Sequence, residues 1–290
     1  MEKAVEFTKK YGAEAQGSIV YTTSPIHSSE SFVKKAKILT EKGIDSLCIK
    51  DMAGLLTPFK AYDLVKKLKS EIEIPIEIHS HNTAGFAFMS YLKAVEAGVD
   101  IIDTAISPFS SGTAQPTTET MSAVLKDRDF DPDLDSRLLE EIGNYFREVR
   151  LKYNQYLGSF EVDPRIIVNQ LPGGMLSNLR NQLKEQNQLD KYDQILEEIP
   201  VVRKDLGYPP LVTPSSQIVG TQATFNVITG ERYSLVSKEF KNYLKGMYGR
   251  PPGEIKPDLI KNIISESEVI KNRPADNLEP LFEKRAAEIA

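Results

Sequence analysis

Two histidines separated by a single residue, His79 and His81, are the side chains whose type and spacing most directly suggest chemistry. They end the segment Ile72–His81 (IEIPIEIHSH), in which isoleucine fills the even-numbered positions from 72 to 78. Side chains alternate along a strand, so both imidazoles point away from the isoleucine face. Together they could bind one divalent cation, with Zn, Mn or Co the suitable ions. The alternative is a hydrogen-bonded pair without metal. The third histidine, His27, is interpreted as an incidental surface residue.

Lys50 lies at the end of a second predicted strand, Asp45–Asp51 (DSLCIKD). Alternation again places Cys48 and Lys50 on the face opposite the aliphatic residues. An inward lysine must be paired, neutralised or modified, because an unpaired buried ammonium is unfavourable. Its neutral amine could take up carbon dioxide as a carbamate, an anionic metal ligand. An ion pair with Asp51 or Asp103 is the alternative, and the residues alone leave both open.

Thr213 and Pro214 have the residue types of a helix start, with threonine as N-cap and proline in the first turn. The threonine hydroxyl could also serve a site at a domain junction. The segment Leu171–Met175 (LPGGM) is interpreted as a turn. The sequence contains no glycine-rich phosphate loop after a strand and no serine nucleophile elbow.

Residues 2 to 113 alternate between helical and strand-like patterns. Strands are predicted over 17–22, 45–51, 75–81 and 99–107, and helices after Ser28/Ser29, after Thr57 and over 86–97. This repeat predicts an α/β fold with a parallel sheet or barrel. Lys50, His79 and His81 then lie at carboxyl ends of strands, where barrel active sites are built.

The pattern becomes mainly helical after Gln115–Pro116. Helices are predicted over 133–153, 176–186, 189–206, 215–227 and 238–247, with a last one from Leu278. We therefore divide the chain into residues 1–127 and 128–290. A closed (β/α)8 barrel needs eight strands and typically about 250 residues. The four βα units of the first part are half the number that such a barrel needs, and a helical domain follows them.

Composition excludes several classes of protein. The 290 residues include 36 Lys and Arg against 41 Asp and Glu, for a net charge of −5, so no basic surface for nucleic acid is expected. The single cysteine, Cys48, allows no disulfide within the chain and fits a reducing cytoplasm. The longest uncharged apolar stretch, 84–92, is far shorter than the roughly 18 residues of a membrane span. We expect a cytoplasmic protein.

Several longer motifs carry a family resemblance. They are Gly17–Pro25 (GSIVYTTSP), Cys48–Pro58 (CIKDMAGLLTP), His79–His81 (HSH), Asp103–Ser110 (DTAISPFS), Gln170–Leu179 (QLPGGMLSNL), Val212–Thr221 (VTPSSQIVGT) and Tyr248–Pro252 (YGRPP). Together they resemble the carboxyltransferase domain of biotin-dependent pyruvate carboxylase, in its separate B subunit, and the alpha subunit of oxaloacetate decarboxylase. Transcarboxylase has a similar subunit. The resemblance covers nearly the whole chain.

The resemblance implies a role for each of these residues. It implies a divalent metal held by a carbamylated Lys50 with His79 and His81, and a Thr213 that moves a proton between biotin and the methyl group of pyruvate. Ser216 and Gln217 match positions that contact biotin, although some members have lysine in place of the glutamine. The implied activity is carboxyl transfer between biotin and pyruvate or oxaloacetate, in either direction.

The same resemblance identifies what these 290 residues do not contain. Family members begin with four further βα units, which implies that residues 1–127 are the C-terminal half of a (β/α)8 barrel (strands 5–8). Those further units supply an aspartate metal ligand, a glutamine and an arginine for the keto acid. They also have a biotin-bearing domain. We therefore expect a C-terminal portion of a longer protein or half of a split enzyme. Its expected partners are an N-terminal barrel half and a biotin carboxyl carrier domain or subunit, within an oligomer.

Two other functions remain open at this point. A metal-dependent aldolase, or a Claisen-type lyase or synthase, also uses a His-x-His pair in a barrel. A catalytically silent fragment that only binds partner subunits is the other alternative. The residues around Lys50 and Thr213 favour carboxyl transfer.

Overall fold

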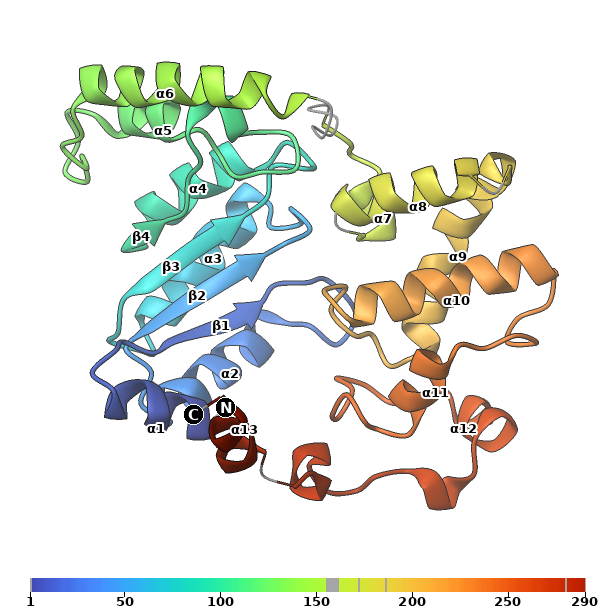
Figure 1. Ribbon diagram of the computed structural model, residues 1–290. Helices are drawn as coiled ribbons and strands as arrows, with labels where there is room; N and C mark the ends of the chain where they lie inside the picture. The colour runs from blue at the N-terminus through green and yellow to red at the C-terminus, as the bar shows by residue number, and fades with distance from the viewer. Residues whose placement is uncertain (1, 155–161, 172, 186, 280, 290) are drawn as a thin grey trace. The chain divides into compact units, whose positions relative to one another are not determined.

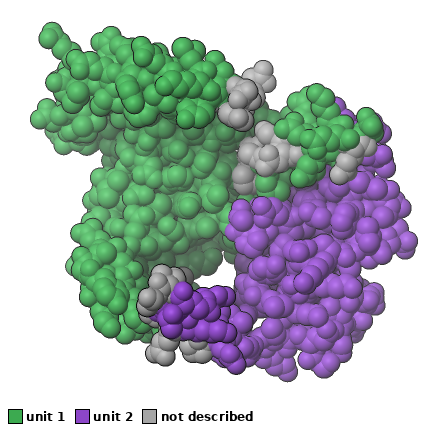
Figure 2. Space-filling model, viewed as in Figure 1, with its two compact units in different colours: residues 1–187, 210–212 green, residues 188–209, 213–290 purple. Residues whose placement is uncertain are grey.

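The computed structural model describes residues 2–154, 162–171, 173–185, 187–279 and 281–289. The chain divides into two compact units (Figure 2). Unit 1 comprises residues 1–187 and 210–212, and unit 2 comprises residues 188–209 and 213–290. The domain boundary between residues 127 and 128 stays a prediction.

Unit 1 is built on a sheet of four parallel strands in the order β1-β2-β3-β4. The strands are β1 (Gln16–Val20), β2 (Ser46–Asp51), β3 (Ile76–Ser80) and β4 (Ile101–Ile102). Each is joined to the next by one helix, namely α2 (Ser29–Glu41), α3 (Pro58–Lys69) and α4 (Ala87–Glu96). These three helices cover one face of the sheet (Figure 1). The predicted α/β fold with a parallel sheet is confirmed.

Alternation of side chains gives the sheet two different faces. On the helix-covered face, Leu47, Ile76 and Ile78 have no exposed surface and form the core with the apolar sides of the helices. The opposite face carries Lys50 in register with His79, and Cys48 in register with Glu77. The sheet thus has one apolar face and one largely polar face, which we call the inner face.

The fourth strand is much shorter than the sequence predicts. The pattern of residues 99–107 predicts an extended segment, but only Ile101 and Ile102 pair with β3. Ala105 makes an isolated bridge with Thr117, and a short 3₁₀ turn follows at Ser107–Phe109. Pro108 explains part of the difference, since proline has no N–H to donate to a sheet.

The helix starts follow the predicted capping only in part. Ser28 caps α2 as expected, because its hydroxyl accepts a hydrogen bond from the Ser31 N–H. Thr57 precedes α3 with Pro58 in the first turn, but its side chain makes no capping hydrogen bond. The turn expected at 171–175 is wrong from Gly173 onward, where a helix starts. Pro172 and the predicted helix end at Gln186 lie outside the described residues.

The remaining helices complete both units. Unit 1 also contains α1 (Glu2–Lys10), α5 (Thr118–Leu125), α6 (Ser136–Leu151), α7 (Ile166–Asn169) and α8 (Gly173–Glu185). Unit 2 contains α9 (Tyr192–Asp205), α10 (Ser215–Thr229), α11 (Lys238–Leu244), α12 (Pro257–Ile263) and α13 (Phe282–Ile289). Across the described ranges, no helix is long and apolar enough to cross a bilayer.

Unit 2 is organised around two helices, α9 and α10. Ile199 and Val202 of α9 and Val219 and Ala223 of α10 are fully buried. The predicted N-cap role of Thr213 is wrong, because α10 starts at Ser215 and Pro214 occupies the cap position. Proline has no side-chain oxygen, and no side-chain capping hydrogen bond forms there.

Candidate active site

The carboxyl ends of β2 and β3 bring Lys50, His79 and His81 together. Lys50 is directly opposite His79 in the parallel register, and His81 follows the last residue of β3. The two imidazole rings have centroids 5.1 Å apart. Their Nε2 atoms are separated by 3.2 Å. The three residues predicted from strand alternation therefore cluster at one edge of the inner face.

Each imidazole is held by an acceptor at its other nitrogen. His79 Nδ1 lies 2.7 Å from Oδ2 of Asp103. His81 Nδ1 lies 2.5 Å from the main-chain oxygen of Thr113. An ionised carboxylate and a carbonyl can only accept, so both histidines donate from Nδ1. In the neutral rings both Nε2 atoms then present lone pairs, and they face each other.

This arrangement fits a metal site. Two nitrogens 3.2 Å apart can both reach a single ion, since zinc–nitrogen bonds are about 2.0–2.1 Å long. Metal-binding histidines usually donate their second N–H to a carboxylate or carbonyl, which is the pattern at Asp103 and Thr113. Among the described residues, no three His, Cys, Asp or Glu side chains are grouped to hold a metal ion. A third ligand from this cluster would therefore have to be of another type, and Lys50 is the candidate.

The predicted ion pair of Lys50 with Asp51 or Asp103 is not formed. Asp103 binds His79, and in the described parts of the chain no carboxylate lies within 4.0 Å of the Lys50 ammonium. Burial lowers the pKa of His81, the hydrogen bond to Thr113 opposes this fall, and the neighbouring His79 and Lys50 groups lower the pKa further. The neutral form of His81, which is the form that binds metal, is therefore favoured.

Asp51 has a structural role that explains why it does not bind Lys50. Neighbouring residues of a strand point to opposite faces, and Asp51 is fully buried on the helix side. Its two carboxylate oxygens accept from the Leu55 and Leu56 N–H groups at 2.9 and 2.8 Å, and the Ser80 hydroxyl donates to it at 2.8 Å. Burial raises the pKa of Asp51, and these hydrogen bonds oppose the rise. Asp51 thus fixes the loop after β2 and ties it to β3.

Gly54 brings the same loop close to His81. It has a φ of +73°, and a Cβ at this position would lie 2.5 Å from the main-chain oxygen of His81. Only glycine allows this approach without displacing one of the two segments. The loop after β2 therefore packs directly against the residue that carries the second imidazole.

The sequence patterns give no role to several polar residues at or near the inner face. Glu77 lies next to Cys48, and burial together with the Glu77 charge raises the pKa of that thiol to about 12. Glu77 also accepts a hydrogen bond of 2.7 Å from Gln16. Gln115 approaches His79 Nε2 at 3.3 Å. Strand alternation does place Glu77 on this face, whereas nothing local in the sequence indicates the loop residues Thr113 and Gln115.

The other three predicted residues lie together in unit 2, at the start of α10. Thr213 and Gln217 are exposed, and Ser216 is buried at 2% exposure. The structure therefore presents the predicted site residues as two groups. Lys50, His79 and His81 form the group in unit 1.

Comparison with known proteins finds a family match in each of the two parts of the chain. The family description "HMGL-like" matches residues 1–145, and "Conserved carboxylase domain" matches residues 166–290. The B subunit of pyruvate carboxylase from Methanocaldococcus jannaschii is 56% identical over 98% of this chain. The methylmalonyl-CoA carboxyltransferase 5S subunit of Propionibacterium freudenreichii is 44% identical over 100% of it.

The fold of this chain also matches that of a solved structure. The carboxyl transferase domain of Rhizobium etli pyruvate carboxylase, determined with pyruvate and biocytin, superposes with a TM-score of 0.93 at 26% identity and covers 100% of this chain. The chain spans 51% of the M. jannaschii protein, 58% of the 5S subunit and 51% of the R. etli chain, or about half the length of such relatives. The chain belongs to the HMGL-like family through residues 1–145, and over nearly its full length it is similar to carboxyltransferase proteins such as the B subunit of pyruvate carboxylase.

Proposed function

We propose that this chain is part of the carboxyltransferase component of a biotin-dependent enzyme. It moves a carboxyl group between biotin, carried on another domain or subunit, and pyruvate or oxaloacetate. The relatives named for carboxyl transfer match nearly the whole chain, including the helical residues 166–290. If relatives had matched only unit 1, a metal-dependent aldolase or a Claisen-type enzyme would be as well supported as a carboxyltransferase.

The observation that carries this proposal is the pairing of His79 and His81. Both donate from Nδ1 to fixed acceptors, and both direct Nε2 to the same point. When bound there, a divalent cation (Zn, Mn or Co) would stabilise the negative oxygen of the pyruvate enolate. His79 and His81 would supply two of its ligands, and they remain fixed because Asp103 and Thr113 hold the rings.

Lys50 would supply a third ligand as a carbamate. The Lys50 ammonium first loses one proton. The neutral amine then attacks carbon dioxide, forming a nitrogen–carbon bond and releasing a second proton, so that a cation becomes an anion. Three features support this assignment: Lys50 shares the inner face with His79, its charge acts on His81, and the carboxylates of Asp51 and Asp103 are engaged elsewhere. An anion next to two neutral imidazoles is a suitable ligand set for a divalent ion.

Thr213 would move the proton that the reaction requires. A proton leaves the methyl group of pyruvate and is carried through the Thr213 hydroxyl to the biotin nitrogen that has lost its carboxyl group. The resulting enolate carbon forms a bond to the released carbon dioxide, giving oxaloacetate. The reverse sequence decarboxylates oxaloacetate. Ser216 and Gln217 would contact the biotin ring, as the family resemblance implies.

The four βα units would form half of an eight-stranded barrel, strands 5 to 8. Support comes from the inner face, where Ile101 of β4 is 42% exposed while Leu47 on the opposite face is fully covered. Four further βα units, within the same polypeptide or a second one, would cover that face and add the remaining ligands of metal and keto acid. Assembly with a biotin carrier and into an oligomer is part of the same proposal.

Metal analysis of the purified protein tests the site. We expect His79→Ala and His81→Ala to lose the bound divalent metal, measured by inductively coupled plasma mass spectrometry. The control is His27→Ala, which removes a histidine outside the proposed site. Wild-type metal content in His79→Ala would contradict the proposal.

The structure corrects the expectation that His27 is a surface residue. The residue is partly buried, its Nδ1 lies 2.7 Å from the Ser24 hydroxyl, and its ring centroid lies 6.2 Å from that of Phe32.

Activity of the complete enzyme tests the reaction. Biotin-dependent release of pyruvate from oxaloacetate should be abolished by Lys50→Ala and strongly reduced by Thr213→Ala. Full activity in Lys50→Ala would exclude the carbamate ligand, and full activity in Thr213→Ala would exclude the proton transfer.

A further inference from the structure

A buried arginine lies on the last turn of α9, ten residues before Thr213. Arg203 is only 4% exposed, and its Nε donates to the main-chain oxygen of Pro209 at 2.9 Å. Burial lowers the pKa of Arg203 to about 10, so the guanidinium remains charged near neutral pH. A charged hydrogen bond in a buried position is among the stronger ones in proteins. Arg203 therefore fixes the main chain in the segment that leads to Thr213.

The chain reverses between Arg203 and Pro209 in a tightly defined turn. The Tyr208 N–H donates to the Arg203 oxygen at 2.9 Å, and the Gly207 N–H donates to the Lys204 oxygen at 3.0 Å. This pair of bonds is the Schellman motif that ends helices. Gly207 and Tyr208 both have left-handed φ values, +78° and +56°. Arg203 thus contacts the outgoing arm of the turn twice, at Tyr208 through its carbonyl and at Pro209 through its side chain.

A second segment of unit 2 holds the turn from another side. The Gly253 N–H donates to the Gly207 oxygen at 2.9 Å, and the Lys256 N–H donates to the Asp205 oxygen at 2.8 Å. A Cβ at Gly207 would lie 2.4 Å from the Gly253 oxygen, so the two backbones are in direct contact. The motif Tyr248–Pro252, which carried part of the family resemblance, leads into this contact.

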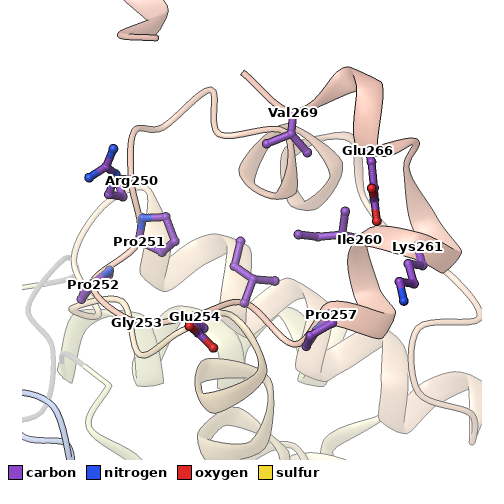
Figure 3. A pocket seen from close by; sticks show the side chains of 11 residues that line it. Arg250, Pro251, Pro252, Gly253, Glu254, Pro257, Ile260, Lys261, Glu266 and Val269 are labelled. Carbon is purple, nitrogen blue, oxygen red and sulfur yellow. The ribbon is translucent and has the colours of Figure 1, made fainter. Parts of the chain in front are cut away.

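Residues 250–257 face the turn on one side and border a cavity on the other. Pro251, Pro257 and Ile260 border a cavity of about 660 Å³ (Figure 3). The two main-chain hydrogen bonds, to Gly207 and Asp205, hold the side of residues 250–257 that faces the turn.

We propose that Arg203 is a positioning residue for Thr213. By holding the Pro209 oxygen, Arg203 sets the direction in which residues 209–214 leave the turn, and with it the place of the Thr213 hydroxyl. Thr213 is exposed and makes no hydrogen bond with any residue in the described ranges, so its position depends on its backbone. The inference rests on the proton transfer proposed for Thr213 above.

A double-mutant cycle in the complete enzyme tests this inference. The variants are Arg203→Met, Thr213→Ala and the double substitution, and the assay is biotin-dependent oxaloacetate decarboxylation. We expect kcat of Arg203→Met to fall by about 100-fold, the size of effect that misplacement by about 1 Å can have, with KM for oxaloacetate within about twofold. The double variant should be no slower than Thr213→Ala alone, because residues acting through one another are not additive.

The control is Arg232→Met, which removes another arginine of unit 2. Arg232 makes a bidentate ion pair with Glu198, with Nε and Nη2 at 2.8 Å from its two oxygens. We expect Arg232→Met to lower the melting temperature while leaving kcat unchanged. Arg203→Lys keeps a charged donor and should recover kcat to within about tenfold of wild type. If Arg203→Met does not fold, the cycle is run with Arg203→Lys.

The outcomes separate the inference from the function on which it rests. Unchanged kcat in Thr213→Ala would overturn the role of Thr213 and the inference with it. A slow Thr213→Ala combined with a normal kcat in the Arg203 variant, or with additive losses in the double variant, would overturn only the positioning role of Arg203.

Discussion

At the scale of single residues, the site depends on partners that the sequence does not place. Strand alternation is sufficient to put Lys50, His79 and His81 on one face, because a period of two needs no knowledge of the rest of the fold. The same alternation does not identify the acceptors that orient the imidazoles. Asp103 lies at the end of the shortened fourth strand, and the Thr113 acceptor is a main-chain carbonyl whose position depends on the path of a loop. Sequence patterns carry no information about that path.

The Asp103 carboxylate provides a direct test of this orientation. In Asp103→Ala, His79 loses its acceptor, the ring can turn, and the Nδ1 and Nε2 tautomers become comparable in energy. We expect metal affinity to fall by about 10- to 100-fold, the usual effect of removing such a partner. Titration of the metal-free protein with zinc measures it. Asp63→Ala, on the exposed side of α3, is the matched control and should bind zinc as the wild type does. Equal affinities in the two variants would show that His79 does not need Asp103.

At the scale of elements, the sequence predicts the βα units but not how their ends are joined. The four strands and three crossover helices follow from hydrophobic period and glycine turns, and all are present. Asp51 is a candidate partner for Lys50 by proximity in sequence, although its parity places it under the helices. A carboxylate at an apolar parity position must find hydrogen bonds. Asp51 finds them in the Leu55 and Leu56 N–H groups, which sequence spacing alone does not identify.

The loop fixed by Asp51 can be tested at Gly54. Two glycines of unit 1 have similar left-handed φ values, +73° at Gly54 and +95° at Gly98. An added Cβ would meet the His81 oxygen at 2.5 Å in the first case and nothing within 4 Å in the second. Gly98→Ala should therefore lose only the conformational term of about 1–2 kcal/mol in free energy of unfolding.

Gly54→Ala should lose more than this, and it should also weaken metal binding because His81 must move. Denaturant unfolding measures the free energy of unfolding, and titration with zinc measures the metal affinity. Equal stability losses in Gly54→Ala and Gly98→Ala, with zinc affinity unchanged in both, would mean that the loop yields without disturbing His81.

At the scale of the whole molecule, the number of βα units is the most informative prediction. Four strands where a barrel needs eight indicate an unfinished sheet, and the structure has an open sheet in which β1 and β4 are the outer strands. One face is covered by α2, α3 and α4, and the other presents polar side chains with Ile101 among them. Composition could not have revealed this, since 40% hydrophobic residues is ordinary for a globular protein.

Covering of the inner face can be tested with two isoleucines of similar exposure. Ile101 is 42% exposed on β4, where its register with Glu77 places it on the inner face, and Ile38 is 46% exposed on α2. If four further βα units complete the barrel, an aspartate at position 101 would be buried against them without a partner, whereas one at position 38 would stay in water. We expect Ile101→Asp to abolish binding of an N-terminal barrel half, supplied as a separate polypeptide, and Ile38→Asp to bind it like the wild type. Analytical ultracentrifugation of the mixtures measures the complex, and circular dichroism confirms that both variants are folded. Equal binding by the two variants would place the completing units elsewhere on the molecule, since a charge buried in the interface cannot be without effect on the free energy of association.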